Sequence, residues 1–536
     1  MNTPPEASSA TAHIEIEPEV YARRWKILAV LCTSLMVVIV GNTALNVALP
    51  TLARQLHASI SEQQWMVDAY GLVFAGLLLT AGTIGDRYGR KGALQFGLTV
   101  FLSGSLFAAF MNSATAVVVG RAIMGFGAAF VMPATLSILT NVFPRHERGK
   151  AIAVWAGISG GGAAIGPVAS GFLLEHFSWG SVFLVNVPII AIALVAGYLL
   201  LPKSRDPEPE RLDPTGALLS IAGLGALVYA IIEAPRRGWG SAESLLWFGL
   251  AAVLIAVFLF WELRNTTPML NLRYFLDPRF GVAAGVITLI FFSMFGFFFL
   301  LTQYFQLVLG YGTLEAGVKQ LPFAAVMVVC APQAPRLAAR FGVNRVVATG
   351  LLGVAAAMGL FTLAGTETSY LEIVPVVMVM AAGMSLAIPS MTGSIMSSVP
   401  LGKAGVGSAM NDTTRELGGA LGVAVLGSLV AGRYAGRLAS TLASLPESLR
   451  GEAEQSLAGA LQAAREVGGS AGDGVAQGAR DAYVSGMHLA AVVGASIAAL
   501  AAVIVYRQLP ATNSHTVIQP VPHENQEFAA ELGTVG

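Results

Sequence analysis

Long apolar segments recur along almost the whole chain, and they limit its possible folds more than any other feature. A helix needs about 20 consecutive apolar residues to cross a bilayer, and the sequence holds about fourteen such segments. Only 12% of the residues are charged and 55% are hydrophobic, which lies far outside the range of soluble globular proteins. We therefore predict an all-α polytopic membrane protein embedded in a lipid bilayer. The segments lie near 27–49, 66–85, 93–112, 114–142, 151–174, 181–201, 215–234 and 245–261, and six more begin near 281, 315, 346, 373, 405 and 487.

The overall charge excludes several function classes. Lys and Arg together number 31 and so do Asp and Glu, so no net charge attracts the chain to nucleic acid. The two cysteines, Cys32 and Cys330, lie inside apolar segments and match no metal or redox spacing. The histidines are scattered rather than grouped with acidic residues. We expect no metal, no cofactor, no nucleic-acid partner and no enzyme activity; a membrane-embedded transferase would need a catalytic cluster that the sequence lacks.

Basic residues indicate the orientation, because Lys and Arg are enriched in cytoplasmic loops. With a cytoplasmic N-terminus, the outer short loops hold only Arg54, Arg236 and Arg237. An even number of spans returns the C-terminus to the same side, so both termini are predicted to be cytoplasmic. The predicted parts are a cytoplasmic tail (1–25), a six-helix bundle (26–201), a cytoplasmic linker (202–214), two inserted helices (215–262), a second six-helix bundle (263–510) with an extracellular loop (431–484), and a disordered tail (511–536).

The two halves of the chain repeat each other. Pro133 and Pro144 enclose a segment of small and apolar residues, and Pro389 and Pro400 enclose a similar one. "IGDRYGRK" from Ile84 is echoed by "LAARFGVN" in the second half. Duplicated six-span halves with a central site near the bilayer midplane are typical of secondary transporters. The architecture therefore indicates a transporter.

Several segments resemble the motifs of a known family. "GTIGDRYGRK" is similar to the signature loop of the major facilitator superfamily, "VVVGRAIMGFGAAF" to its fourth-span arginine motif, and "GISGGGAAIGPVASG" to its fifth-span antiporter motif. With "NTALNVALP" in the first span and "NDTTRELGGALGVAVLGSL" in the thirteenth, the chain resembles the fourteen-span drug:proton antiporter subfamily over nearly all of 25–510. The resemblance implies two six-helix bundles, and we expect a monomer that exchanges protons for small amphiphilic substrates.

The signature loop has a physical interpretation of its own. Its glycines share one helix face and allow close helix packing, while Asp86 is expected to meet a basic partner or a helix N-terminus and hold one conformation closed. The alternative is that these charges only set topology. The echo has Ala339 in place of the acid, which predicts an asymmetric gate. The predicted gating residues are Gly82, Gly85, Asp86, Arg87, Gly89 and Arg90.

The fifth-span motif contains two ladders of small residues four apart, which permit tight and bendable helix packing. The first is Gly157 and Gly161, and the second is Gly162, Gly166 and Ser170, which ends beside Pro167. The glycines are similar to those of a dinucleotide-binding loop, but no strand precedes them and the last spacing is one residue too long. We interpret the ladders as a packed hinge.

Ionisable residues inside spans are costly and mark functional sites by default. Arg121 in the fourth span has no basic counterpart in the second half, and the resemblance assigns it to the proton pathway; a packing role is the alternative. The subfamily usually carries a first-span acid where this chain has Gly41. Asp68, at a similar depth, is then the predicted proton carrier of the N-terminal half, unless it is a charge on the outer rim.

A second group of ionisable residues lies in the thirteenth span. Asp412, Arg415 and Glu416 are three and four apart, so they share one helix face. Asp412 and Glu416 are predicted to take part in proton coupling, and a structural ion-pair network is the alternative. Sparse polar groups and aromatic side chains suggest a substrate cavity, and its predicted residues are Asn42, Asn46, Phe292, Phe295, Gln303, Tyr304 and Arg415.

The sequence thus predicts proton-coupled efflux of hydrophobic or amphiphilic compounds, such as drugs, antibiotics and dyes. A dedicated exporter of one endogenous metabolite, siderophore or lipid is the alternative.

Overall fold

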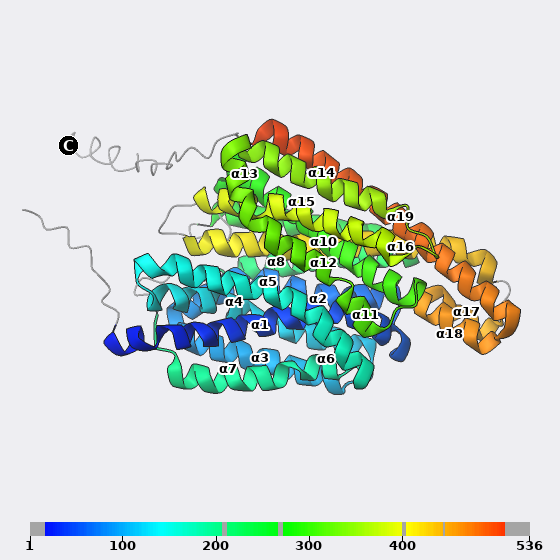
Figure 1. Ribbon diagram of the computed structural model, residues 1–536, viewed down its shortest axis with the longest axis horizontal. Coiled ribbons are helices and arrows are strands. Elements are labelled where there is room, and N and C mark those ends of the chain that lie inside the picture. Colours follow the sequence, from blue (N-terminus) through cyan, green and yellow to red (C-terminus); the bar gives the residue numbers. More distant parts are fainter. Residues whose placement is uncertain are drawn as a thin grey trace, which may run out of the picture. The chain divides into compact units, whose positions relative to one another are not determined.

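A computed structural model gives the architecture, and it describes residues 17–205, 212–265, 268, 272–398, 404–442 and 445–509. These residues form helices joined by short connections, with no strand among them (Figure 1). The N-terminal helices are α1 (Pro18–Gln55), α2 (Ile60–Tyr88), α3 (Arg90–Phe110), α4 (Ala114–Val142), α5 (Arg145–His176), α6 (Ser181–Leu184) and α7 (Asn186–Leu200), and the inserted pair is α8 (Pro214–Arg237) and α9 (Ala242–Arg264). The remaining elements are η1 (Leu272–Leu276), α10 (Pro278–Gln303), η2 (Tyr304–Val308), α11 (Thr313–Val318), α12 (Leu321–Cys330), η3 (Ala331–Gln333), α13 (Ala334–Phe341), α14 (Val343–Phe361), α15 (Tyr370–Ser397), α16 (Ala404–Leu442), α17 (Glu447–Gln455), α18 (Leu457–Val467) and α19 (Gly469–Gln508).

The helix lengths confirm the predicted number of spans. Within the described ranges, 13 helices are long and apolar enough to cross a membrane. α5 contains 32 residues and is long enough to be one more. The fold is therefore the predicted all-α membrane fold with about fourteen spans.

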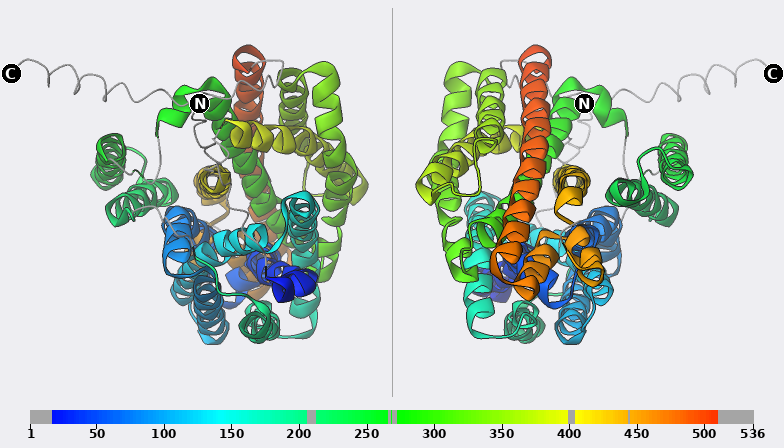
Figure 2. Two further views of the ribbon diagram at one scale, coloured as in Figure 1. Left: turned by 90° about the vertical axis from the view of Figure 1, so that its left-hand side faces the viewer. Right: turned by 90° about the vertical axis from the view of Figure 1, so that its right-hand side faces the viewer.

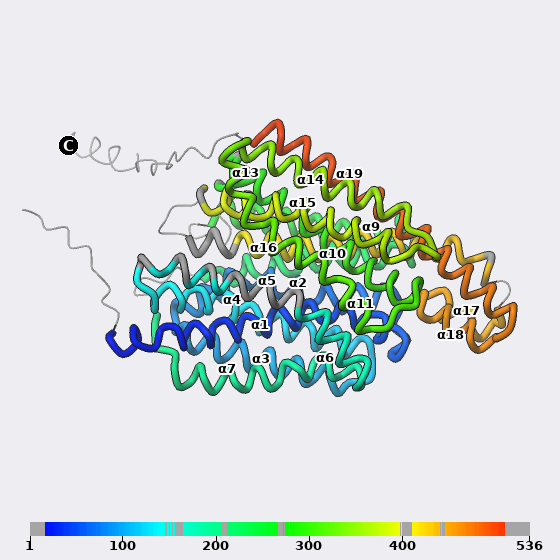
Figure 3. The backbone as a smooth tube through the Cα atoms, viewed as in Figure 1, coloured from blue at the N-terminus to red at the C-terminus, as the bar shows by residue number. Residues whose placement is uncertain are grey.

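The chain divides into two compact units. The first comprises Met1–Leu56, Trp65–Pro214 and Gly312–Val318, and the second comprises His57–Gln64, Thr215–Tyr311 and Lys319–Gly536. The inserted helices α8 and α9 therefore belong with the C-terminal half. His57–Gln64 belongs to the second unit although it lies early in the sequence, and Gly312–Val318 belongs to the first unit although it lies in the second half of the sequence. Figure 3 traces the chain through both segments.

The internal repeat is visible as two equivalent helix pairs. A Cβ atom on Gly97 of α3 would lie 2.7 Å from the carbonyl oxygen of Gly127 on α4. A Cβ on Gly350 of α14 would lie 2.5 Å from that of Gly383 on α15. Each pair thus packs backbone against backbone, which only small residues allow.

The echoed motif also produces the same corner twice. Gly89 separates α2 from α3 with φ of 123°, and Gly342 separates α13 from α14 with φ of 91°. An L side chain is strained at such angles, so both corners require glycine. The similarity of "IGDRYGRK" and "LAARFGVN" therefore reflects a shared backbone conformation rather than shared charges.

The segment 431–484, predicted to be an extracellular loop with one or two surface helices, is helical over most of its length. α16 continues to Leu442 and α19 begins at Gly469, with α17 and α18 between them. Figure 2 shows α19 as one long helix, coloured orange to red. The buried Tyr434 hydroxyl of α16 donates a hydrogen bond to the Ala453 carbonyl of α17 at 3.0 Å, which fixes the short helices to the longer ones.

Within the second unit, a proline in α8 leaves a backbone carbonyl to which α16 donates a hydrogen bond. Pro235 in α8 cannot donate a hydrogen bond to the carbonyl of Ile231, four residues earlier. The Ser428 hydroxyl of α16 donates to that carbonyl at 2.8 Å instead, and its environment is buried. Ser61 donates to the neighbouring Ile232 carbonyl at 3.4 Å. The proline thus creates an acceptor that α16 uses.

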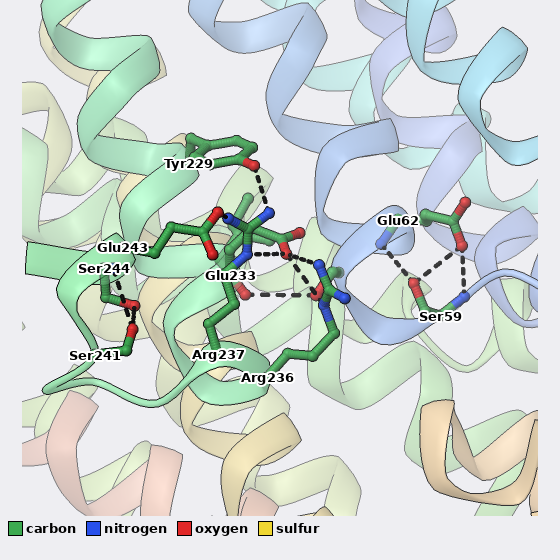
Figure 4. A network of polar contacts seen from close by, with 11 residues as sticks. Ser59, Glu62, Tyr229, Glu233, Arg236, Arg237, Ser241, Glu243 and Ser244 are labelled. Atoms are coloured by element: carbon green, nitrogen blue, oxygen red, sulfur yellow. Dashed lines mark hydrogen bonds and ion pairs between the residues drawn. The ribbon is translucent and has the colours of Figure 1, made fainter. Parts of the chain in front are cut away.

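Arg236 and Arg237, two of the basic residues on the predicted outer side, lie in the last turn of α8. Glu233 accepts from Arg236 at 2.7 Å and from Arg237 at 3.3 Å, as Figure 4 shows. Arg237 also pairs with Glu243 of α9 and donates to the Tyr229 hydroxyl. Both arginines are therefore ion-paired with acids of the insert itself.

Candidate functional site

Arg121 is the largest fully buried side chain of the N-terminal unit, with none of its surface exposed. It lies in α4 and donates three hydrogen bonds of 3.0 Å: Nε to the Met66 carbonyl, Nη1 to the Gly41 carbonyl, and Nη2 to Oδ1 of Asn42. All three acceptors are neutral. The guanidinium is therefore held by oriented dipoles of α1 and α2.

A close helix approach makes this arrangement possible. Gly125, one turn after Arg121 in α4, packs directly against the carbonyl of Tyr70 in α2. The Tyr70 ring then lies 4.3 Å from the guanidinium carbon of Arg121, within the range of a cation–π interaction. The absence of a side chain at Gly41 leaves its carbonyl as the acceptor where the resemblance implied an acid. Predicted residue Asn46 lies one turn after Asn42 and is half-buried.

Asp68 lies in α2 and is 1% exposed. Among the described residues, neither of its carboxylate oxygens has a hydrogen-bond partner. Burying an ionised carboxylate without a partner is costly, and protonation removes that cost. This makes Asp68 the kind of group whose charge state can be coupled to a conformational change.

The two faces of α2 separate Asp68 from Arg121. Met66 and Tyr70, four residues apart, lie on the face that contacts Arg121. Asp68 follows Gln64 by one turn and shares its face. Gln64 is fully buried and donates to the α16 carbonyls of Val423 and Ala424, at 3.0 and 2.9 Å.

The structure thus joins Arg121 to Asn42 but shows no hydrogen bond between Arg121 and Asp68. Gln64 is a functional residue that the sequence alone did not predict. Its local signal is an amide one turn before the ionisable residue Asp68.

The signature loop has the partners that its charges require. Asp86 accepts a hydrogen bond of 2.6 Å from Nε of Arg90 and one of 3.1 Å from the Ser137 hydroxyl of α4. The basic partner is thus four residues away in the same loop. Predicted glycines Gly82 and Gly85 pack closely, because added Cβ atoms would lie 3.4 Å from Pro133 and 3.1 Å from Ala93. Arg87 lies over the exposed ring of Tyr88.

Lys91 of the same loop closes the end of α7. Its ammonium donates to the carbonyls of Tyr198 and Leu201 at 2.7 and 2.8 Å. The last carbonyls of a helix lack partners within the helix, and a cation there also interacts favourably with the helix dipole. The Arg90 amide donates to the Ser204 carbonyl at 3.0 Å, so the loop fixes the chain after α7 as well.

The fifth-span motif forms a close contact with α11 inside the first unit. A Cβ on Gly317 would lie 2.5 Å from the carbonyl oxygen of Pro167, and the Thr313 hydroxyl donates to the Gly171 carbonyl at 3.1 Å. Gly166 packs against Thr43 of α1. The packing of this half of the motif is therefore as tight as predicted. The surroundings of Gly157 and Gly162 lie outside the described residues.

The thirteenth-span cluster lies beside aromatic rings. Arg415 donates to Asp412 at 3.4 Å, and its guanidinium carbon lies 4.6 Å from the ring centroid of Phe291. Phe291 in turn contacts the predicted cavity residue Phe295, with ring centroids 6.2 Å apart. Glu416 is half-buried on the same helix face. The cluster thus combines a paired charge with an aromatic wall.

Glycines of the same motif bring α16 close to α10. Added Cβ atoms on Gly418 and Gly422 would contact the carbonyls of Thr288 and Phe292. Phe292, another predicted cavity residue, is thereby buried to 6% exposure. These glycines have the same four-residue spacing as the small residues of the fifth span, and this spacing predicts close helix packing here as well.

Two other predicted cavity residues direct their polar groups toward backbone carbonyls. Gln303 donates to the Phe299 carbonyl of its own helix at 3.3 Å. The Tyr304 hydroxyl donates to the Gly365 carbonyl at 2.6 Å, and Tyr304 is fully buried. Both groups therefore stabilise the end of α10. Among the described residues, no three His, Cys, Asp or Glu side chains are arranged to bind a metal ion.

Comparison with known proteins gives the family context. The family model described as Major Facilitator Superfamily matches residues 31–423. The chain is 35% identical to the multidrug efflux pump LfrA of Mycolicibacterium smegmatis over 90% of its own length and 96% of that protein. It is 31% identical to the tetracenomycin C resistance and export protein of Streptomyces glaucescens, with 96% of both chains covered. It is 32% identical to the methyl viologen resistance protein SmvA of Salmonella typhimurium, over 86% of this chain and 93% of that protein.

Solved structures support the same fold. A bacterial homologue of the human lysosomal transporter Spinster, in an inward-facing and unoccupied conformation, matches with a TM-score of 0.62 at 17% identity, over 90% of this chain and 98% of that one. A D-xylose–proton symporter matches with a TM-score of 0.60 at 13% identity, over 91% and 98%.

Proposed function

Because the chain belongs to the major facilitator superfamily, we propose that it exports hydrophobic or amphiphilic small molecules from a bacterial cell in exchange for protons. The relatives named for multidrug efflux and methyl viologen resistance support this proposal, since they align over most of both chains. The protein would act by alternating access, as a monomer in the inner membrane with both termini in the cytoplasm. The basic inner loops support that orientation.

The observation that carries the proposal is the pair of buried ionisable groups in the N-terminal unit. Arg121 donates to three oriented neutral acceptors, which offset the cost of burying its charge. Asp68 is buried without a hydrogen bond to its carboxylate. A proton bound at Asp68 removes a buried charge, and this gives protonation a differential free energy between conformations. Asp412 and Glu416 are the second proposed coupling pair.

A dedicated exporter is the second candidate. One relative is named for tetracenomycin C resistance and export and another for methylenomycin A resistance, so individual compounds occur among the names of the relatives. The aromatic wall beside Arg415 suits either a broad or a narrow set of flat, apolar compounds. The breadth of the substrate range separates the two candidates.

Growth inhibition across a panel of dyes and antibiotics tests both. Cells with and without the protein are compared, each with and without an uncoupler. Roughly 150 mV of proton-motive force supplies about 3.5 kcal/mol per proton, which maintains a gradient of a few hundredfold. We expect uncoupler-sensitive protection against several cationic and neutral compounds. Protection that survives the uncoupler would contradict proton coupling, and protection against a single compound would favour the dedicated exporter.

A further inference from the structure

Two tyrosine rings face the ammonium group of Lys319, and a phenylalanine ring packs against both of them. The Lys319 nitrogen lies 4.1 Å from the ring centroid of Tyr311 and 4.2 Å from that of Tyr370. An ammonium within about 6 Å of a ring centroid is attracted to the ring face. Phe305 is fully buried and contacts both tyrosines, with centroid distances of 5.7 and 6.3 Å. We call Tyr311, Tyr370 and Phe305 the aromatic cage.

The backbone holds the cage together without the lysine side chain. The Tyr311 amide donates to the Phe305 carbonyl at 2.9 Å, which closes the turn after η2. Tyr370 begins α15, whose first turn is closed by a reciprocal pair of hydrogen bonds between Ser369 and Glu372. The Tyr370 hydroxyl donates to the backbone carbonyl of Lys319 at 3.1 Å. These contacts of the rings do not involve the Lys319 ammonium, so the rings keep their positions when the lysine side chain turns away from them.

The cage is accessible and lies in an acidic part of the sequence. Tyr311, Tyr370 and Lys319 are all half-buried rather than enclosed. Tyr311 lies in the connection between η2 and α11, Lys319 lies in the connection between α11 and α12, and Tyr370 is the first residue of α15. With the predicted orientation, this end of α15 faces the outside. Between 346 and 402 the chain has acidic residues at Glu367 and Glu372 and no Lys or Arg, so Tyr370 is flanked in sequence by acids alone.

We propose that the aromatic cage is a binding site for organic cations, in which Lys319 acts as a tethered competitor that a quaternary ammonium or similarly delocalised cation displaces. A lysine ammonium is compact and strongly hydrated, whereas such cations are weakly hydrated because their charge is not carried on an N–H group. Aromatic faces bind a cation best when little water must be removed from it. The site would receive amphiphilic cations at the exit side, and in this respect it rests on the proposed export function.

Binding of ethidium to the purified full-length protein in lipid nanodiscs tests the proposal, with fluorescence anisotropy as the readout. Lys319→Met keeps the apolar stem and removes the competitor, so we expect ethidium to bind about 5- to 30-fold more tightly. Lys319→Arg is the matched control, because its guanidinium also stacks on aromatic rings and should keep wild-type affinity. The neutral dye N-phenyl-1-naphthylamine should bind all three proteins equally.

A ring substitution completes the test. In the Lys319→Met background, Tyr311→Leu should return ethidium affinity to the wild-type level, and Tyr311→Phe should not, because phenylalanine keeps the ring face. Unchanged ethidium binding by Lys319→Met, or an equal gain for the neutral dye, would overturn the proposal. A lower melting temperature of Lys319→Met with unchanged binding would mean that the cluster is structural only. Because binding needs no proton gradient, failure of proton-driven transport would leave this result intact, and the two proposals can fail separately.

Discussion

Gly41 is the position where this chain departs from the subfamily it resembles, and the structure shows what a side chain there would meet. A Cβ atom at Gly41 would lie 2.8 Å from Cζ of Phe101. Carbon atoms normally pack at about 3.5–4.0 Å, so the ring would have to move by about 1 Å. Phe101 is fully buried, and α4 packs against its backbone at Gly127. We expect Gly41→Ala to destabilise the protein by about 1–3 kcal/mol through overpacking.

Gly41→Asp adds the same Cβ and also a carboxylate next to Arg121. Nη1 of Arg121 is 3.0 Å from the Gly41 carbonyl, so a carboxylate at this position is within reach of the guanidinium. A hydrogen bond to a charged group contributes about 1.5–3 kcal/mol. The aspartate variant should therefore be more stable than the alanine variant by about that amount at pH 7. The difference should shrink as the pH falls and the new carboxylate is protonated.

Thermal unfolding of the purified variants in detergent, at pH 7 and pH 5, measures both the cost of overpacking and the stabilisation by the new carboxylate. At pH 7 Gly41→Ala should have the lowest melting temperature, and Gly41→Asp should recover most of the difference from wild type. In a Phe101→Leu background, Gly41→Ala should lose most of its effect because the shorter side chain vacates the space. The reasoning about Phe101 is refuted if Gly41→Ala is as stable as wild type. The reasoning about Arg121 is refuted if the aspartate variant is no more stable than the alanine variant.

Three further predictions concern the gate, the insert and the topology. Asp86→Asn should lower efflux at least several-fold while abundance in the membrane stays near wild type, because the carboxylate joins Arg90 and α4; efflux assays with quantitative immunoblots check this, and unchanged efflux would reduce the loop to a topology signal. Ser428→Ala should cost about 1–3 kcal/mol of stability by leaving the carbonyl freed by the α8 proline without its donor, whereas Ser428→Thr should not; equal melting temperatures for both variants would contradict this role. Single cysteines at Ser204 and Ser470 should react with an impermeant maleimide from opposite sides of the membrane, and labelling from one side would contradict the predicted orientation.

The span count and the internal repeat could be predicted because they depend on local sequence. Apolar length alone locates a transmembrane helix, and the glycines at Gly89 and Gly342 mark the same corner in both halves. The extension of α16 and α19 into 431–484 was harder to predict from the sequence. Hydropathy falls there, but the Ala-rich sequence still favours a helix, and neighbouring helices supply the packing.

The partners within the candidate site could not be predicted from the sequence, because they come from distant segments. Gln64 binds carbonyls more than 350 residues away, with sequence separations of 359 and 360. Lys91 closes a helix that ends 107 to 110 residues later. Every residue has a backbone carbonyl, so the sequence does not show which carbonyls accept hydrogen bonds. The position of Arg121 in an apolar span predicts that it is buried, but it does not predict which neutral groups accept its hydrogen bonds. Helix faces, in contrast, could have shown that Asp68 and Met66 point in different directions.

Substrate-driven proton flux tests the central claim most directly. Purified protein is reconstituted into proteoliposomes that contain the pH dye pyranine, and ethidium is added in the absence of a membrane potential. We predict that wild type moves protons opposite to ethidium, and that Asp68→Asn abolishes this proton flux while ethidium exchange continues. Glu62→Gln is the matched control, since it removes an acid from the start of the same helix and should behave as wild type. If Asp68→Asn still accumulates ethidium against its gradient in response to an imposed pH difference, Asp68 is not the carrier, and Asp412 and Glu416 take its place.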